Sequence, residues 1–96
     1  MNRHDTENIF LRLNDRWAIS FDRLQWLVMQ RTGSGRWQAV SFVASEKRVL
    51  QRVLREKGCH PTLEAANALL HMPERFTEWL AQREAGEQLS RQEAAE

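Results

Sequence analysis

The spacing of the apolar residues changes at Ser45, and this change constrains the fold more than any other feature of the chain. Up to residue 44, large apolar residues alternate with other residues, which is the period-two pattern of half-buried strands. After Ser45 they recur every three or four residues, as they do along one side of a helix. Strands followed by helices predict an α+β domain, here a four-stranded antiparallel meander followed by three helices.

The first two predicted strands, at about 9–13 and 17–21, form a hairpin. The register that places their large apolar groups on one face pairs Leu13 with Trp17, Leu11 with Ile19, and Ile9 with Phe21. This register requires a three-residue loop, 14–16. Phe10 and Arg12 then point to the opposite face, so we expect them to be the strand residues most available to a partner.

The third and fourth strands, at about 25–31 and 36–44, are joined by the glycine-containing turn 32–35. Both strands carry apolar residues on both faces. Such strands lie at the centre of a two-sided layer, or in a sheet whose second face meets a partner. Under the second alternative, the partner-binding residues are Leu27, Met29, Val40 and Phe42.

A helix is predicted at about 46–57, with Ser45 as its N-cap and Gly58 as its C-terminal stop. Its apolar stripe consists of Val49, Leu50, Val53 and Leu54, and its other side carries Lys47, Arg48, Arg52 and Arg55. We expect the apolar stripe to pack on the sheet.

Two shorter helices are predicted at about 62–70 and 74–83, with Pro61 and Pro73 in their first turns. The residues expected to face inward are Leu63, Ala66 and either Leu69 or Leu70 in the first helix, and Phe76, Trp79 and Leu80 in the second. Residues 1–84 then make a single domain. The polar residues 85–96 are expected to form a tail, either a frayed helix or a disordered segment.

The composition is that of one small globular domain, with 96 residues, 42% apolar and 28% charged. The single cysteine, Cys59, cannot form an internal disulfide, which is typical of a reducing compartment. No apolar run approaches the roughly 20 residues that span a bilayer, and the polar N-terminus does not resemble a signal peptide. We therefore expect a cytoplasmic protein without a membrane partner.

The charge is distributed unevenly along the chain. Residues 1–58 contain 11 Lys or Arg and 6 Asp or Glu, whereas residues 59–96 contain 3 and 7, so the two halves carry net charges of +5 and −4. Twelve of the 14 basic residues are Arg, whose planar guanidinium suits phosphate, carboxylate and aromatic partners. Codon usage in a GC-rich genome explains an excess of Arg, but it does not explain the asymmetry.

Metal sites and catalytic sites are not predicted. The candidate ligands His4, Cys59, His60 and His71 lack the paired spacing of zinc sites. Glu74 and Glu78 lie one helical turn apart, but their polar neighbours indicate a solvated surface. Since no nucleophile or metalloprotease signature is present, we expect a protein that is not an enzyme, with no catalytic residue, metal or cofactor.

Aromatic and basic residues are interleaved in the strand half, as in sheets that bind single-stranded nucleic acid by base stacking and phosphate attraction. The predicted nucleic-acid-binding residues are Phe10, Arg12, Arg16, Arg31, Arg36 and Trp37. For any one of the rings, the alternative is that it belongs to the core. The basic side of the first helix is a second candidate surface.

A tryptophan strand, a Gly-rich hairpin, the strand segment 36–40 and a helix opening at Ser45 together resemble small accessory proteins of phages, prophages and mobile elements. The resemblance covers residues 9–58 and implies a DNA-binding accessory protein or an inhibitor of host defence, such as an anti-CRISPR protein. The order of elements is also similar to the PC4-like coactivator fold, in which four strands and a helix bind single-stranded DNA, often as a dimer.

We therefore expect a non-catalytic binding protein, an accessory factor of a phage or mobile element, that engages nucleic acid or a nucleoprotein complex through its basic, aromatic half. Two alternatives stay open. In the first alternative, the chain is an inhibitor that binds a protein of a host defence system through the second sheet face or through the acidic helices at 62–83. In the second alternative, the chain is a homodimeric interaction module that pairs through Leu27, Met29, Val40 and Phe42.

Overall fold

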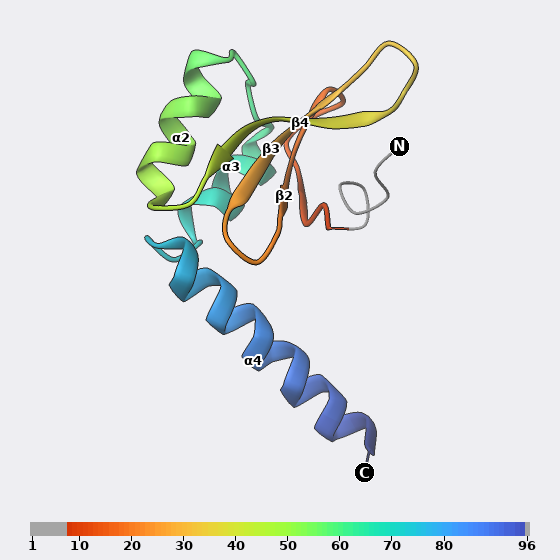
Figure 1. The fold of residues 1–96 in the computed structure, drawn as a ribbon, viewed down its shortest axis with the longest axis vertical. Helices are drawn as coiled ribbons and strands as arrows, with labels where there is room; N and C mark the ends of the chain where they lie inside the picture. Colours follow the sequence, from red (N-terminus) through yellow and green to blue (C-terminus); the bar gives the residue numbers. More distant parts are fainter. Residues whose placement is uncertain (1–7, 96) are drawn as a thin grey trace.

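The computed structural model of the chain describes residues 8–95, with side chains described up to Gly86. An antiparallel sheet of four strands comes first, in the order β1 (Leu11–Arg12), β2 (Trp17–Phe21), β3 (Trp26–Arg31) and β4 (Trp37–Val43). The helices α2 (Lys47–Glu56), α3 (Leu63–Leu70) and α4 (Phe76–Ala95) follow (Figure 1). The predicted α+β fold, a four-stranded meander followed by three helices, is confirmed.

The helices cover one face of the sheet and form the main core with it. Ile19 and Val28 are partners in the β2–β3 ladder and are fully buried, and so are Trp26 on β3 and Leu50 on α2. The other buried members of this core are Leu13, Val43, Leu54, Cys59, Ala65, Leu69, Phe76 and Trp79. The expected packing of the first helix on the sheet is therefore observed.

The first hairpin has the predicted register from Leu11, the partner of Ile19, to Leu13, whose N–H donates to Trp17 O at 2.9 Å, but the register does not continue to Ile9. Phe10 faces the helices, with its ring centroid 5.9 Å from that of Phe21. Regular pairing in β1 covers only Leu11–Arg12, so the alternation is lost before Leu11, and Phe10 and Leu11 both pack on the main core. The predicted pairing of Ile9 with Phe21 is wrong, because Ile9 packs on the other face.

A β-bulge in β4 changes the direction of Val40. Val28 pairs with Ser41 and Met29 with Ala39, which leaves Val40 as an extra residue in the ladder. The bulge brings Val40 to the side of the main core, against which it packs. The prediction that Val40 and Met29 share a face is therefore wrong, since strict alternation does not hold through a bulge.

The second face of the sheet has a small core of its own. Ala18, Leu27 and Met29 are buried there, and the partly buried Ile9, Trp37 and Ala39 pack against them. Leu27 is 6% exposed and Met29 is fully buried, so the predicted use of these two side chains to bind a partner is wrong for this structure. The sheet is a two-sided layer, the other interpretation of its apolar strands.

Helix α2 begins after Glu46 rather than Ser45, and no side chain caps it. Backbone contacts replace the cap: Lys47 N donates to Glu74 O at 2.7 Å and Phe76 N donates to Ser45 O at 3.0 Å. The carbonyl of Glu74 thus accepts the Lys47 N–H, an amide of the first turn that a serine cap could otherwise bond. The predicted Ser45 cap is wrong.

The end of α2 is confirmed at Gly58. Gly58 has a φ of 69°, which favours glycine. Its N–H donates to Arg55 O at 3.1 Å, and Cys59 N donates to Leu54 O at 3.0 Å. These two bonds are those of a Schellman motif, which satisfies carbonyl groups of the last helical turn.

Lys47 is buried, although it was predicted to lie on the exposed basic side of α2. The residue is 6% exposed, and its ammonium group donates to the carbonyls of Leu70 at 2.9 Å and Met72 at 2.8 Å. The Glu74 carboxylate lies 3.4 Å away. Residues 47, 50 and 54 share one side of the helix, so Lys47 extends the buried stripe and ties α2 to the end of α3.

Helix α3 faces the core with Leu69, as one of the two predicted alternatives had it, but with Ala65 in place of the predicted Leu63. Ala65 and Leu69 are buried, whereas Leu63 is 81% exposed and Leu70 is 64% exposed. Thr62 is the N-cap, and its hydroxyl accepts a hydrogen bond from Ala65 N at 3.2 Å. This cap sets the phase of the helix and places Pro61 before the cap rather than in the first turn.

Helix α4 buries Phe76 and Trp79, and Leu80 packs on the same core, as predicted. Pro73 precedes the helix rather than lying in its first turn. The helix continues to Ala95 instead of ending at residue 83, so the predicted polar tail is helical from residue 85 to 95. Figure 1 shows this second half extending away from the sheet.

Candidate nucleic-acid interface

Arg12, Arg31 and Trp37 meet on the face of the sheet that turns away from the helices. The guanidinium carbons of Arg12 and Arg31 lie 4.9 Å and 6.0 Å from the centroid of the Trp37 ring. Both arginines are exposed, and Trp37 is half-buried. A cation over an exposed ring is stabilised by about 0.5–1 kcal/mol, so the indole ring holds two positive charges in defined positions.

The register of the sheet explains this arrangement. Arg31 and Trp37 are direct partners in the β3–β4 ladder. Arg12 lies two strands further away on β1, and the side chains between them belong to Ala18 and Met29. Because Trp37 packs against the cluster that contains Ala18 and Met29, its ring lies over the sheet, within reach of Arg12. The sheet thus fixes the ring, and the ring positions the guanidinium groups.

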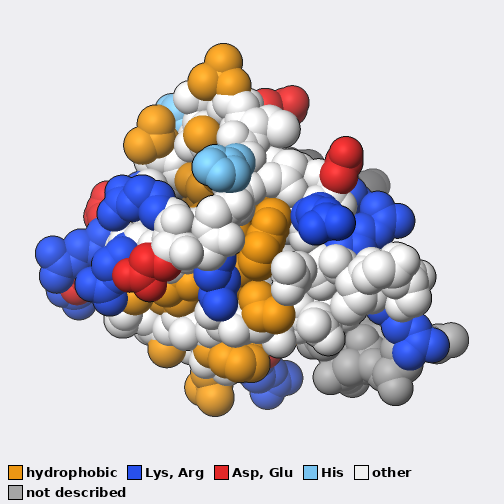
Figure 2. Space-filling view, turned by 90° about the horizontal axis from the view of Figure 1, so that it is seen from above, with side chains coloured by type: hydrophobic (Ala, Val, Ile, Leu, Met, Phe, Trp, Pro, Cys, Tyr) orange, Lys and Arg blue, Asp and Glu red, His pale blue; other side chains and the backbone are white. Residues whose placement is uncertain are grey.

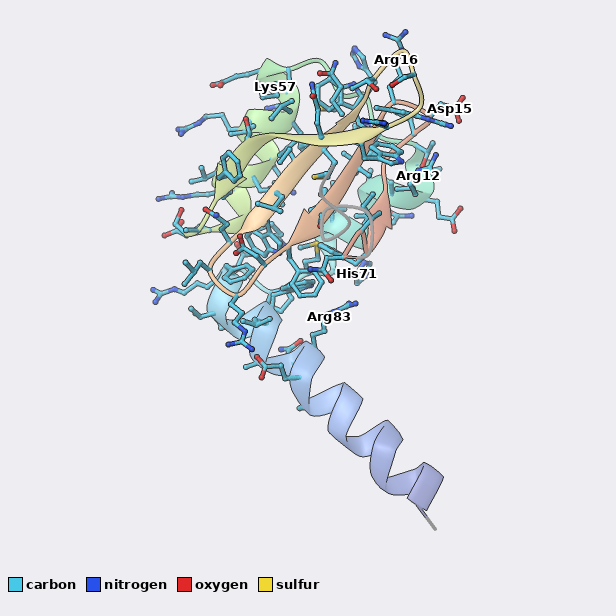
Figure 3. All side chains as sticks on the ribbon, turned by 45° about the vertical axis from the view of Figure 1, so that its right-hand side comes forward. Arg12, Asp15, Arg16, Lys57, His71 and Arg83 are labelled. Carbon is cyan, nitrogen blue, oxygen red and sulfur yellow. The ribbon has the colours of Figure 1, made fainter. Side chains whose placement is uncertain are left out.

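Arg16 and Arg36 lie in the turns at the same end of the sheet. Arg31 N donates to Arg16 O at 2.8 Å, and Thr32 N donates to Arg36 O at 2.7 Å. The set of Arg12, Arg16, Arg31, Arg36 and Trp37 is called the basic end from here on. Figure 3 shows Arg12 and Arg16 at this end and Arg83 at the opposite end of the sheet.

Asn14 organises the turn that carries Arg16. Its side-chain oxygen accepts hydrogen bonds from Arg16 N at 2.8 Å and Trp17 N at 3.0 Å. Its amide nitrogen donates to Cys59 O and to His60 O. The turn is therefore attached to the connection between α2 and α3. Asn14 lies in the predicted loop 14–16, and asparagine is typical of turns in which the side chain bonds to the backbone.

No arginine of the basic end forms an ion pair within the described part of the chain. Among the side chains of residues 8–86, the ion pairs join Lys47 to Glu74, Arg48 to Glu46, and Arg52 to Glu56. Asp15 lies exposed in the turn beside Arg16 without pairing with it in that set. Figure 2 views the molecule from this end and shows blue Lys and Arg side chains at its right, while the blue side chains at its left lie over α2. The arrangement suits an anionic ligand.

Five of the six predicted nucleic-acid-binding residues thus lie together, and Phe10 does not. The Phe10 ring lies 4.6 Å from that of Trp79, in the aromatic cluster of the main core. The guanidinium of Arg83 lies over this cluster, 4.8 Å from the Phe21 centroid and 5.8 Å from that of Phe10. Phe10 was predicted to face away from the core because strict alternation was assumed before Leu11, and this predicted orientation is wrong.

The predicted partner-binding set is dispersed. Leu27 and Met29 are buried in the second core, and Val40 packs on the main core. Phe42 is 60% exposed. These four residues therefore do not form one apolar face.

No metal site is found among the described residues, where no three His, Cys, Asp or Glu side chains are grouped. His4 lies outside the described residues. Cys59 is buried, and desolvation raises the pKa of its thiol from 9.0 to about 11, with the nearby Lys57 opposing this shift. A neutral buried thiol is a poor nucleophile.

Comparisons with protein-family models, with curated proteins and with solved structures found no similar protein. The likeness to mobile-element accessory proteins and to the PC4-like fold therefore stays a prediction. Within residues 8–95, no helix combines the length and the apolar character needed to cross a membrane.

Proposed function

We propose that the chain is a non-catalytic protein that binds single-stranded nucleic acid at its basic end. The observation that carries the proposal is the pair of guanidinium groups on the Trp37 ring, neither of which is paired with a carboxylate in the described part of the chain. Two like charges beside one ring repel each other, and a phosphate bound near them would offset that repulsion. Arginine is also suited to phosphate because its N–H groups can make bidentate hydrogen bonds.

The ring and the cations have complementary roles in this proposal. Arg12, Arg16, Arg31 and Arg36 contact phosphates and follow the backbone of the strand. A base stacks on the Trp37 ring or on a guanidinium plane above it, as unpaired bases do on aromatic and arginine side chains. Unstacked bases are accessible in a single strand, whereas a duplex hides them. The proposal therefore predicts a preference for single strands.

The experiment is fluorescence anisotropy with a labelled oligothymidylate and with a labelled duplex of equal length. Wild type should bind the single strand more tightly, and the variant Arg12→Ala/Arg31→Ala should bind it at least tenfold more weakly at low salt. The matched control is Arg48→Ala/Arg52→Ala, which removes the same charge from exposed positions of α2. This control should retain most of the affinity.

Equal losses in both variants would refute the assignment to the basic end, because net charge or the basic side of α2, the second candidate surface, would then contribute as much to binding. Tighter binding of the duplex would refute the single-strand preference. Absence of binding at low salt would remove nucleic acid as a direct partner and favour a protein target, the competing interpretation of the sequence.

A further inference from the structure

A pocket lies between the last turns of α2, the α2–α3 connection and α3, and the turn that carries Arg16 is attached to this connection. Its volume is about 340 Å³, at the lower end of the range of small-molecule sites. Apolar walls are formed by Leu54, Cys59, Pro61 and Leu69, and Gln51, Arg55 and His60 add polar groups. A planar ring system fits such a site, because it has two apolar faces and a polar edge.

The wall of the pocket is held in place by backbone geometry. Gly58 and His60 have φ angles of 69° and 45°, and the Schellman motif fixes the chain on leaving α2. Asn14 bonds to the carbonyls of Cys59 and His60. A pocket whose wall is already ordered loses less entropy when a ligand binds.

The same Asn14 joins the pocket to the basic end. Its side-chain oxygen accepts a hydrogen bond from Arg16 N at 2.8 Å, while its side-chain nitrogen donates to the carbonyl of His60 in the wall of the pocket. A strand whose phosphates lie on Arg16 therefore passes close to the pocket. Arg55, which is exposed at the pocket, supplies a further cation for a phosphate.

The chemistry of the lining suits a neutral ring. The Cys59 thiol is protonated at neutral pH, and burial moves its pKa further from neutrality, to about 11. The Gln51 amide offers both a donor and an acceptor, the combination that the edges of nucleobases require. His60 is exposed at the pocket and can stack on a ring.

We propose that this pocket takes one unstacked nucleobase of the single strand bound at the basic end. The inference rests on the proposed function, since the phosphates on the basic end bring the base to the pocket. It adds a base-binding subsite formed by α2, the α2–α3 connection and α3, in which Gln51 bonds to the edge of the base.

The test is a ¹⁵N NMR titration of the whole chain with an oligothymidylate and with an abasic oligonucleotide of the same number of phosphates. The oligothymidylate should shift both the Trp37 indole N–H signal and the Gln51 side-chain amide signals. The abasic strand should shift signals of the basic end and leave the Gln51 amide unchanged. Gln51→Ala should weaken oligothymidylate binding about fivefold, the loss of one net hydrogen bond, whereas Gln82→Ala on the exposed side of α4 should not.

The outcomes separate the two proposals. Shifts at Trp37 without shifts at Gln51 would refute the base pocket and leave the proposed function standing. Shifts at neither site would refute both. Equal shifts of Gln51 with the abasic strand would also refute the pocket, because the base would then not be the group recognised.

Discussion

Replacing Lys47 with methionine tests the most unexpected contact in the fold. The Lys47 ammonium donates to the carbonyls of Leu70 and Met72 at 2.9 Å and 2.8 Å, while the residue is 6% exposed. Methionine has a similar length but cannot donate, so Lys47→Met leaves both carbonyls without this partner.

The expected magnitude follows from these two bonds. A buried acceptor left without a partner costs about 1–3 kcal/mol. Both hydrogen bonds are only part-buried, so the lower end of that range applies to each carbonyl. Methionine also carries no charge that must be desolvated on folding, and this gain offsets part of the loss. We expect a net loss of about 2 kcal/mol in the free energy of unfolding, or a fall of about 8–16 °C in Tm for a domain of this size.

The assay is urea denaturation followed by tryptophan fluorescence, since Trp26 and Trp79 are buried and change environment on unfolding. Arg48→Met is the matched control, because Arg48 is the next residue and its side chain is 79% exposed in its ion pair with Glu46. The control should change stability by less than about 0.5 kcal/mol. If Lys47→Met were no less stable than Arg48→Met, the inferred role of the buried ammonium would be wrong.

Three further predictions concern other parts of the fold. Gly58→Ala should lower the free energy of unfolding by about 1 kcal/mol, because the φ of 69° is unfavourable for alanine, whereas the added Cβ would meet only His60 Nε2 at 4.0 Å. The control is Gly33→Ala, since Gly33 has open space around it and no positive φ. Equal melting temperatures of the two variants would contradict the prediction. Cys59 should react slowly with iodoacetamide at pH 8 in the native chain and rapidly in urea. The pKa of the Cys59 thiol is about 11 in the folded chain and 9.0 as the ordinary value, so the contribution of the buried thiol to stability is full below pH 9 and is lost as the pH rises through 11. Cys59→Ala should lack this loss of stability at high pH. Rapid alkylation of the native chain would contradict the prediction. Phe10→Ala should destabilise the chain by about 2–3 kcal/mol and leave the salt dependence of oligonucleotide binding unchanged. Weaker binding at unchanged stability would show instead that Phe10 belongs to the interface.

The order of the elements was predictable from the sequence because each depends on local spacing. Alternation predicts β2 to β4, and the three- and four-residue spacing after Ser45 predicts α2. Gly58 was identified as a helix end because a positive φ selects glycine there. These features need no knowledge of which elements meet.

The errors arise where tertiary contacts override a local rule. The lost alternation before Leu11 and the bulge at Val40 each turn a side chain to the other face, and composition does not signal either change. Lys47 was assigned to the surface by its charge, although its position on the stripe of Leu50 and Leu54 indicates burial. Its carbonyl partners belong to α3 and the segment after it, so no local pattern reveals them.

The candidate site was predictable in part. Four arginines and one tryptophan of the predicted set lie together because alternate turns of a meander lie at the same end of the sheet. The contact between Arg12 and Trp37 depends on the register of all four strands. Asn14 and the pocket depend on a connection more than 40 residues away in the sequence, which explains why neither was identified.

The most direct test of the account is the slope of log binding constant against log salt concentration for an oligothymidylate. Each phosphate contact in a single strand contributes about −0.7 to this slope. We predict that Arg12→Ala/Arg31→Ala flattens the slope by about 1.4 relative to wild type, while Arg48→Ala/Arg52→Ala leaves it unchanged. An unchanged slope in the first variant would contradict the claim that the guanidinium groups on Trp37 bind phosphate.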